Sequence, residues 1–189
     1  MIRFTLMILL IHLFNVGFSQ PKFEKEKRIK QKEAPENAVN FVDSMNLPGK
    51  IKWYKETGYN QTSFEAKTKY NAKILSIEFS ENGAFEDFEI EINPEEILPA
   101  AYKSLSDYLQ NAHGKYAIEK VQIQYSGDTK LILNYFLHSE SKGLITQYEI
   151  VISTKENNAF VMYEYLFDEK GAFVKKSEIR MKMTDNIEY

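Results

Sequence analysis

The residues best suited to chemistry lie in the acidic stretch EDFEIE. Strand-like alternation places Asp87, Glu89 and Glu91 on one side of this stretch, about 7 Å apart. Two carboxylates at such spacing can act as general acid and base, or they can bind a cation such as calcium. The competing interpretation is a solvated strand face whose charges are balanced across the sheet by Lys67 and Lys69. The sequence contains no Asp/Asn/Gly loop of the calcium-binding type, so the solvated face is favoured.

Other catalytic chemistry has little support in the sequence. The chain contains no cysteine, which excludes thiol catalysis and disulfides. A serine nucleophile or a metal site would draw on histidine, and beyond the first 20 residues only His113 and His138 remain. Neither histidine has a second ligand at metal-binding spacing. We therefore expect no catalytic residues, no metal and no cofactor, and we expect that the protein is not an enzyme.

Several expected strands are apolar on both faces. If Tyr163 and Tyr165 meet a helix, alternation turns Phe160, Met162 and Leu166 to the opposite face. A sheet face that is open to water should not be this apolar. Either another part of the chain covers this face, or the face receives a partner.

Three further residues join this surface. Ile132 and Phe136 lie in the apolar segment 131–137, which is expected to be a strand with two apolar faces. Alternation buries Trp53 and leaves Tyr54 exposed. The candidate partner-binding residues are thus Phe160, Met162, Leu166, Ile132, Phe136 and Tyr54.

The first 20 residues, MIRFTLMILLIHLFNVGFSQ, have the pattern of a secretory signal peptide. Arg3 precedes an apolar run that is shorter than the roughly 20 residues of a membrane span. The small residues Gly17 and Ser19 favour cleavage after Ser19. We expect an exported protein, periplasmic or secreted, with no membrane span after cleavage. The net charge of −3 and the lack of a basic tract argue against a nucleic-acid partner.

Hydrophobic spacing predicts the elements that position these residues. Apolar residues three and four apart predict helices over 35–46 and 94–112. Period-two alternation predicts strands through most of the remaining chain. Residues 20–33 form a charged N-terminal segment, in which Phe23 and Ile29 suit an edge strand.

The two halves of the chain share a pattern. The stretch SENGAF returns as DEKGAF, and each copy follows a helix and strands in the same order. This predicts two tandem repeats, residues 34–93 and 94–182, followed by a short tail over 183–189. Because strands joined by short turns pair antiparallel, the expected fold is α+β, with two lobes that each pack one helix on about four strands.

The shared turn has a structural explanation. Gly83 and Gly171 occupy the same place between two strands, where a positive φ is needed. Asn82 would also suit positive φ, but Lys170 would not. If both copies use one turn, it is a type I turn closed by a bulged glycine.

These motifs resemble a known group. The hairpin LFDEKG with Gly171, preceded by the strand YEI at residues 148–150, is similar to the PepSY-like, β-lactamase-inhibitor-like domains of secreted bacterial proteins. The resemblance covers roughly residues 25–179; the first copy departs from it, with Ser80 in the place of Asp168. It implies a non-catalytic module that binds a protein or peptide in the cell envelope. Such a module could act as an inhibitor of an envelope or secreted enzyme. The alternative function is a small-ligand or cation-binding protein that uses the acidic strand face.

Overall fold

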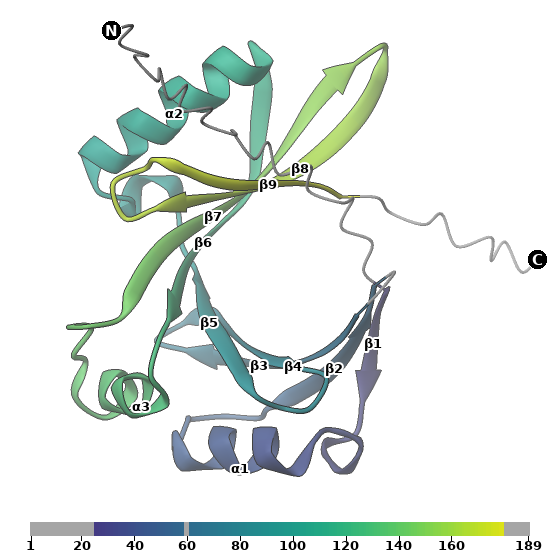
Figure 1. Cartoon of the computed structure of the whole chain (residues 1–189), viewed down its shortest axis with the longest axis vertical. Coiled ribbons are helices and arrows are strands. Elements are labelled where there is room, and N and C mark those ends of the chain that lie inside the picture. Colours follow the sequence, from purple (N-terminus) through teal and green to yellow (C-terminus); the bar gives the residue numbers. More distant parts are fainter. Residues whose placement is uncertain (1–24, 59–60, 180–189) are drawn as a thin grey trace, which may run out of the picture.

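The computed structural model describes residues 25–58 and 61–179, and its nine strands form a single antiparallel sheet in chain order (Figure 1). The strands are β1 Lys25–Ile29, β2 Lys52–Thr57, β3 Thr62–Tyr70, β4 Lys73–Ser80, β5 Phe85–Glu91, β6 Tyr116–Ser126, β7 Ile145–Glu156, β8 Ala159–Asp168 and β9 Phe173–Ile179. The α-helices are α1 Glu36–Ser44, α2 Pro99–His113 and α3 Thr129–His138. Short 3₁₀ turns, Gln31–Glu33 and Pro94–Glu96, precede α1 and α2.

The expected division into two lobes is wrong. β5 pairs with β6 from Asp87 to Glu91, so the strands on both sides of α2 belong to one continuous sheet. This pairing satisfies the backbone groups that an isolated edge strand would leave open. Two hydrophobic clusters still lie on the helix-bearing face, one involving α1, α3 and β2–β5 and one involving α2 and β6–β8.

Both predicted amphipathic helices are present. α1 buries Ala38 and Val42 on the face given by the three- and four-residue spacing. α2 begins at Pro99, later than expected, and buries Leu105 and Leu109 completely. The edge strand predicted around Ile29 is also present as β1, whereas Phe23, the proposed signal peptide and the tail 183–189 lie outside the described residues.

The strand predicted over 131–137 is wrong, because this segment forms α3. Asp128 caps the helix, since its Oδ1 accepts a hydrogen bond from the backbone N–H of Lys130 at 2.8 Å. The helix places Phe136 4.8 Å from Phe88, measured between ring centres. Helical spacing thus gives a single apolar face over β5, where the strand interpretation assumed two.

The two similar hairpins, β4–β5 and β8–β9, have the same turn geometry. Gly83 and Gly171 have φ of 75° and 77°. The backbone N–H of Gly83 donates to the carbonyl of Ser80 at 2.8 Å, and Gly171 makes the same bond to Asp168 at 2.9 Å. In both hairpins the strand register shifts next to the turn. Asn82 and Lys170 are not among the residues with positive φ, in keeping with a type I turn closed by glycine.

Each of these hairpins also packs against the start of a helix. The Asn37 side chain donates from Nδ2 to the carbonyl of Asn82 at 3.0 Å, which ties the first hairpin to α1. The Ser104 hydroxyl donates to the carbonyl of Gly171 at 3.0 Å, which ties the second to α2. The repeated sequence therefore marks a helix–hairpin contact made twice within one sheet.

Candidate functional site

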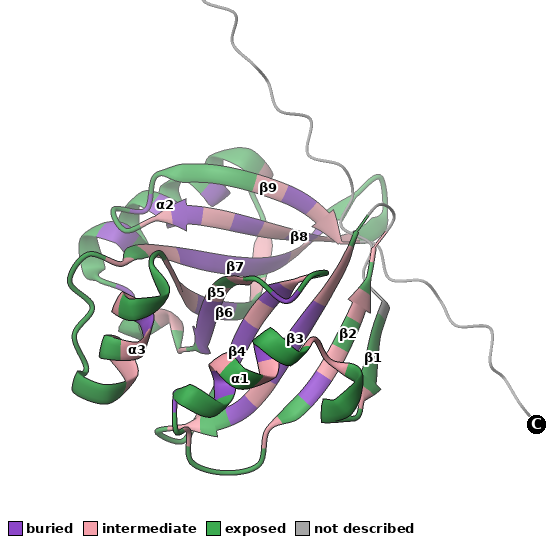
Figure 2. Cartoon of the chain, turned by 60° about the horizontal axis from the view of Figure 1, so that its bottom comes forward, coloured by how far each residue is buried: buried purple, intermediate pink, exposed green. Residues whose placement is uncertain are grey.

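The face of the sheet opposite the helices is concave and open. All three helices lie on the outer side of the curved sheet (Figure 1), and buried positions alternate with less buried ones along the strands (Figure 2). The inner side encloses a hollow of about 680 Å³ that residues of all nine strands line. The strands β1 and β2 contribute one residue each, Glu26 and Glu56, and each of the other strands contributes two or more. We call this the acidic hollow.

Negative charge is concentrated in the acidic hollow. Its lining holds ten carboxylates and three lysines, a net charge of −7. The whole chain carries only −3, so the residues outside the hollow carry a net charge of +4. A concave surface of one sign focuses its field, and this hollow therefore favours a cationic occupant.

Three carboxylates face one another across neighbouring strands at the hollow. Glu65 on β3 lies directly opposite Glu78 on β4, and Glu78 lies directly opposite Asp87 on β5. We call these three residues the acidic row. Like charges in directly opposite positions destabilise a sheet. Burial, and then the carboxylates of Glu65, Glu56, Glu89 and Asp87, raise the pKa of Glu78 well above its usual range.

Replacing Glu78 with glutamine is expected to raise the free energy of unfolding at neutral pH. The pKa of Glu78 is higher in the folded than in the unfolded chain, so the folded protein favours the protonated form. Wild-type stability should therefore rise as the pH falls from neutral towards the ordinary value of 4.5, and the variant should lack this gain. Urea unfolding across this pH range measures both effects. A Glu78→Gln variant that is less stable than the wild type at pH 7 would contradict this prediction. Glu36→Gln on α1 is the control, because it removes a carboxylate that lies outside the hollow.

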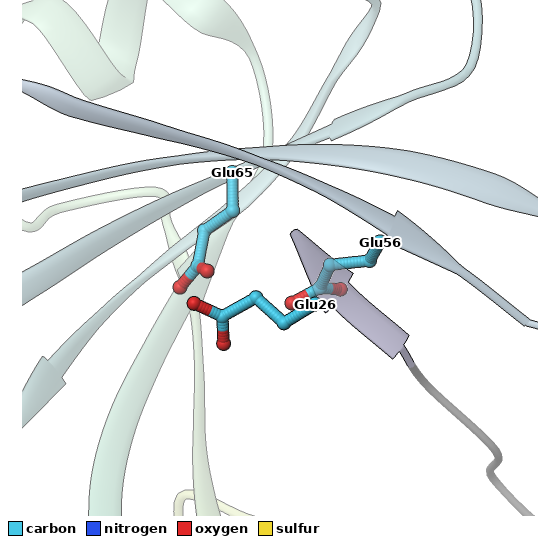
Figure 3. Close-up of side chains that lie close together, drawn as sticks. All are labelled: Glu26, Glu56 and Glu65. Atoms are coloured by element: carbon cyan, nitrogen blue, oxygen red, sulfur yellow. The ribbon is translucent and has the colours of Figure 1, made fainter. Parts of the chain in front are cut away.

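A second group of carboxylates lies at the β1 edge of the hollow. The ligand oxygens of Glu26, Glu56 and Glu65 lie within 4.8 Å of one another, and their side chains converge from three strands (Figure 3). An ammonium group already lies among them: Lys67 Nζ is 2.6 Å from Glu65 and 3.3 Å from Glu26. Burial alone would lower the pKa of Lys67, but these two carboxylates raise it above its usual range. The internal cation therefore offsets one of the three negative charges, and a metal ion would compete with it for Glu26 and Glu65.

The three acidic residues singled out in the sequence all line the hollow. Asp87, Glu89 and Glu91 share one side of β5, as alternation predicted. Their proposed balance by Lys67 and Lys69 is wrong, because β4 lies between β3 and β5. Glu89 instead accepts a hydrogen bond from Gln124 Nε2 of β6 at 3.1 Å.

Three of the candidate partner-binding residues lie on the open face, on β8. Leu166 lines the hollow, and Met162 is paired with Ile179, another lining residue. Phe160, near the end of the β7–β8 hairpin, is 82% exposed, more than any other large hydrophobic residue of the described chain. These side chains give the hollow an apolar border on one side.

The other candidates are distributed differently. Ile132 is fully buried within α3 and does not reach the surface, so its assignment to a binding surface is wrong. Phe136 is half-buried against Phe88 on the helix-bearing face, because α3 covers that face. Tyr54 does lie on the open face, opposite Glu65, and its ring centre is 5.0 Å from Lys67 Nζ.

The histidines have structural surroundings. His113 Nε2 lies 2.6 Å from the hydroxyl of Tyr165, and its ring stacks on Tyr163. Burial, and then the charge of Lys176, lower the pKa of His113, so its neutral form is favoured. His138 is exposed at the end of α3. The acidic hollow contains neither residue.

Sequence reasoning missed Glu65, Glu78 and Gln122. Gln122 on β6 is 4% exposed and lies between Glu91 and Glu149 on the neighbouring strands. Alternation assigns each of these residues to the polar side of its own strand, but their convergence depends on strand register. The signal that could have placed Glu65 opposite Glu78 is the short connection at Asn71.

None of the helices in the described ranges is both long and apolar enough to cross a membrane.

No protein-family model matches the chain, and no curated protein matches its sequence. Solved structures match its fold.

A BLIP-like protein from Bacteroides fragilis is 15% identical, with a TM-score of 0.50 over 80% of this chain and 92% of that chain. A DUF2874 family protein from Bacteroides uniformis is 11% identical, with a TM-score of 0.52. The match covers 77% of this chain and 89% of that chain. A protein from Bacteroides eggerthii, described as a candidate periplasmic protein, is 13% identical, with a TM-score of 0.50. The match covers 77% of this chain and 88% of that chain.

The chain therefore has a BLIP-like fold. This agrees, at the level of the fold alone, with the β-lactamase-inhibitor-like part of the resemblance. The PepSY likeness and the tandem copies are not confirmed by these structures.

Proposed function

We propose that this chain is an exported, non-enzymatic module that binds a protein or peptide on the open face of its sheet and thereby inhibits or sequesters an envelope or secreted enzyme. Export is supported by the signal-peptide pattern of the first 20 residues and by the likeness to a candidate periplasmic protein. The inhibitor-like role is supported by the BLIP-like fold.

One observation carries the proposal: the open face combines a charged hollow with exposed apolar side chains. A solvated sheet face that served only to keep the protein in solution would not need Phe160 to be 82% exposed. Exposed hydrophobic side chains next to polar and charged groups are typical of protein-binding surfaces.

Capture from an envelope extract tests the proposal. Immobilised wild-type protein is compared with Phe160→Glu and Met162→Lys, and the captured proteins are identified and quantified by mass spectrometry. Both variants place a charge within the apolar border and are expected to reduce specific capture about tenfold or more, because burying an unpaired charge is costly.

Leu98→Glu is the matched control. Leu98 is 64% exposed at the start of α2, on the other side of the sheet, so its replacement introduces the same charge as Phe160→Glu at another exposed site. The control should capture what the wild type captures. If the two open-face variants, folded by circular dichroism, recover the same proteins in the same amounts, the proposed face is wrong.

Cation binding is the second candidate function, and the convergence of Glu26, Glu56 and Glu65 favours it over the Asp87, Glu89 and Glu91 set proposed from sequence. Lys67 weakens this candidate, since it already neutralises Glu65. Thermal unfolding with calcium and with a chelator tests it, because a ligand specific for the folded state raises stability with its concentration.

A further inference from the structure

The acidic hollow offers acceptors to an occupant and few donors. Gln122 is 4% exposed, lines the hollow, and its Oε1 has no hydrogen-bond partner within the described part of the chain. A buried carbonyl oxygen without a partner is costly and rare in folded proteins. The strands on its two sides present carboxylates at the directly opposite positions, Glu91 and Glu149. An occupant that satisfies Gln122 must therefore be a hydrogen-bond donor in an acidic environment.

The acidic row also favours a cationic hydrogen-bond donor, for a reason independent of Gln122. Glu65, Glu78 and Asp87 are directly opposite one another on three adjacent strands. At the neighbouring edge of the hollow, the protein itself places a cation next to such carboxylates, because the ammonium of Lys67 contacts both Glu65 and Glu26. The chemistry that fits this face is thus an ammonium or guanidinium group.

The size and border of the hollow favour a protein segment over a bare ion. Its volume of about 680 Å³ is within the range of about 300–1,000 Å³ that accommodates organic ligands. Val151, Leu166 and Ile179 contribute apolar surface to the same lining. Lysine and arginine pack their aliphatic stems on apolar surface while the charged group reaches a polar partner.

Resting on the proposed function, we infer that the partner docks a basic segment in the acidic hollow, with lysine or arginine side chains that pair with Glu65, Glu78 and Asp87 and donate to Gln122 Oε1. The separation of charge within the chain, −7 in the hollow against +4 elsewhere, orients such a segment towards this face. Pairing with a cation also relieves the repulsion along the acidic row, so binding stabilises the folded protein.

Octalysine is the probe that tests this inference. Isothermal titration calorimetry on the purified protein measures its affinity, with octaglutamine as the uncharged peptide of equal length. The double variant Glu78→Gln/Asp87→Asn removes two carboxyl groups from the row and is expected to weaken octalysine binding about tenfold or more, since hydrogen bonds to charged groups are stronger than those between neutral groups. Added salt should weaken the wild-type interaction.

A matched double variant controls for net charge. Glu36→Gln/Asp43→Asn removes two carboxylates from exposed positions of α1, on the other side of the sheet, and should leave octalysine affinity within about twofold of wild type. Gln122→Met removes the buried acceptor at similar volume and should weaken binding while keeping the acidic row intact. Urea unfolding of each variant shows that the protein is folded under the conditions of the titration.

Several results would overturn the inference. One is octalysine binding that is no tighter than octaglutamine binding. Another is an α1 variant that loses as much octalysine affinity as the row variant. Calcium that binds through Glu26, Glu56 and Glu65 and excludes octalysine would point to a cation site instead. If octalysine fails to bind while Phe160→Glu still abolishes capture, the inference is wrong and the proposed function stands. If the row variant loses octalysine while the Phe160 variant captures normally, the inferred chemistry is supported and the proposed apolar contact is wrong.

Discussion

Gly171→Ala is expected to destabilise the protein by about 3 kcal/mol or more. The residue has a φ of 77°, which costs an alanine about 1–2 kcal/mol. A Cβ at this position would also lie 2.2 Å from the carbonyl oxygen of Ala101 in the first turn of α2. Backbone atoms cannot rotate away as a side chain can, so the helix would have to shift, and overpacking of this kind adds about 1–3 kcal/mol. In a thermal melt the midpoint should fall by about 10 °C.

Two other glycines provide graded controls. Gly49→Ala shares the backbone strain, with a φ of 91°, but its nearest obstacle is the Thr68 hydroxyl at an ordinary 3.6 Å. Gly83→Ala would meet the side chains of Asn37 and Pro35 at 2.2 and 2.5 Å, and the Asn37 side chain can move. The expected order of destabilisation is Gly171, then Gly83, then Gly49. Equal losses at Gly171 and Gly49 would show that the close approach to α2 is unimportant.

Local patterns in the sequence predict local structure well in this protein. The spacing of Ala38 and Val42 identifies α1, and alternation identifies most strands, because these patterns depend only on which side of an element is buried. The comparison of Lys170 with Asn82 also selects the right turn, since the two hairpins share one geometry. Such inferences need no knowledge of which elements are neighbours.

Pairing across a long connection was not predictable in this way. β5 and β6 are separated by α2, and periodicity does not show whether Glu91 and Gln122 end on one sheet or on two. The segment of α3 was misassigned for a related reason. A short apolar run fits a buried strand or a buried helix, and the cap at Asp128 is the local feature that distinguishes them.

The acidic row was predictable only in part, because it depends on strand register set by a short local turn. Asn71 and Ala72 have φ of 48° and 64° and form a two-residue connection that pairs Tyr70 with Lys73. That turn fixes Glu65 opposite Glu78. An Asn-Gly pair would have signalled the turn clearly, but alanine rarely adopts positive φ, so the sequence concealed the register.

Lys67→Met is expected to destabilise the protein by about 3 kcal/mol. The Glu65 side chain is only 4% exposed and has Lys67 Nζ at 2.6 Å. Removing the lysine leaves the buried Glu65 carboxylate without its ammonium partner. Loss of one partner of a buried ion pair costs about 3–5 kcal/mol. The 30% exposure of Lys67 places the expected loss at the low end of this range, because water partly replaces the ammonium.

The double variant Glu65→Gln/Lys67→Met separates the ion pair from packing. It removes both charges and should recover most of the stability that Lys67→Met loses, so the two changes are strongly coupled in a double-mutant cycle. In the wild type the carboxylates raise the pKa of Lys67, so its stabilising contribution is present below the ordinary value of 10.5 and is lost only as the pH rises above it.

These measurements also bear on the acidic hollow. Because Lys67 Nζ lies 2.6 Å from Glu65, which belongs to the acidic row, Lys67→Met should make Glu65 more available to an incoming cationic side chain. The variant should then bind octalysine more tightly than the wild type, even though it is less stable in the absence of the peptide, because the peptide restores the missing pair. Equal octalysine affinity in the two proteins would show that Lys67 and an incoming cation do not compete for the same carboxylates.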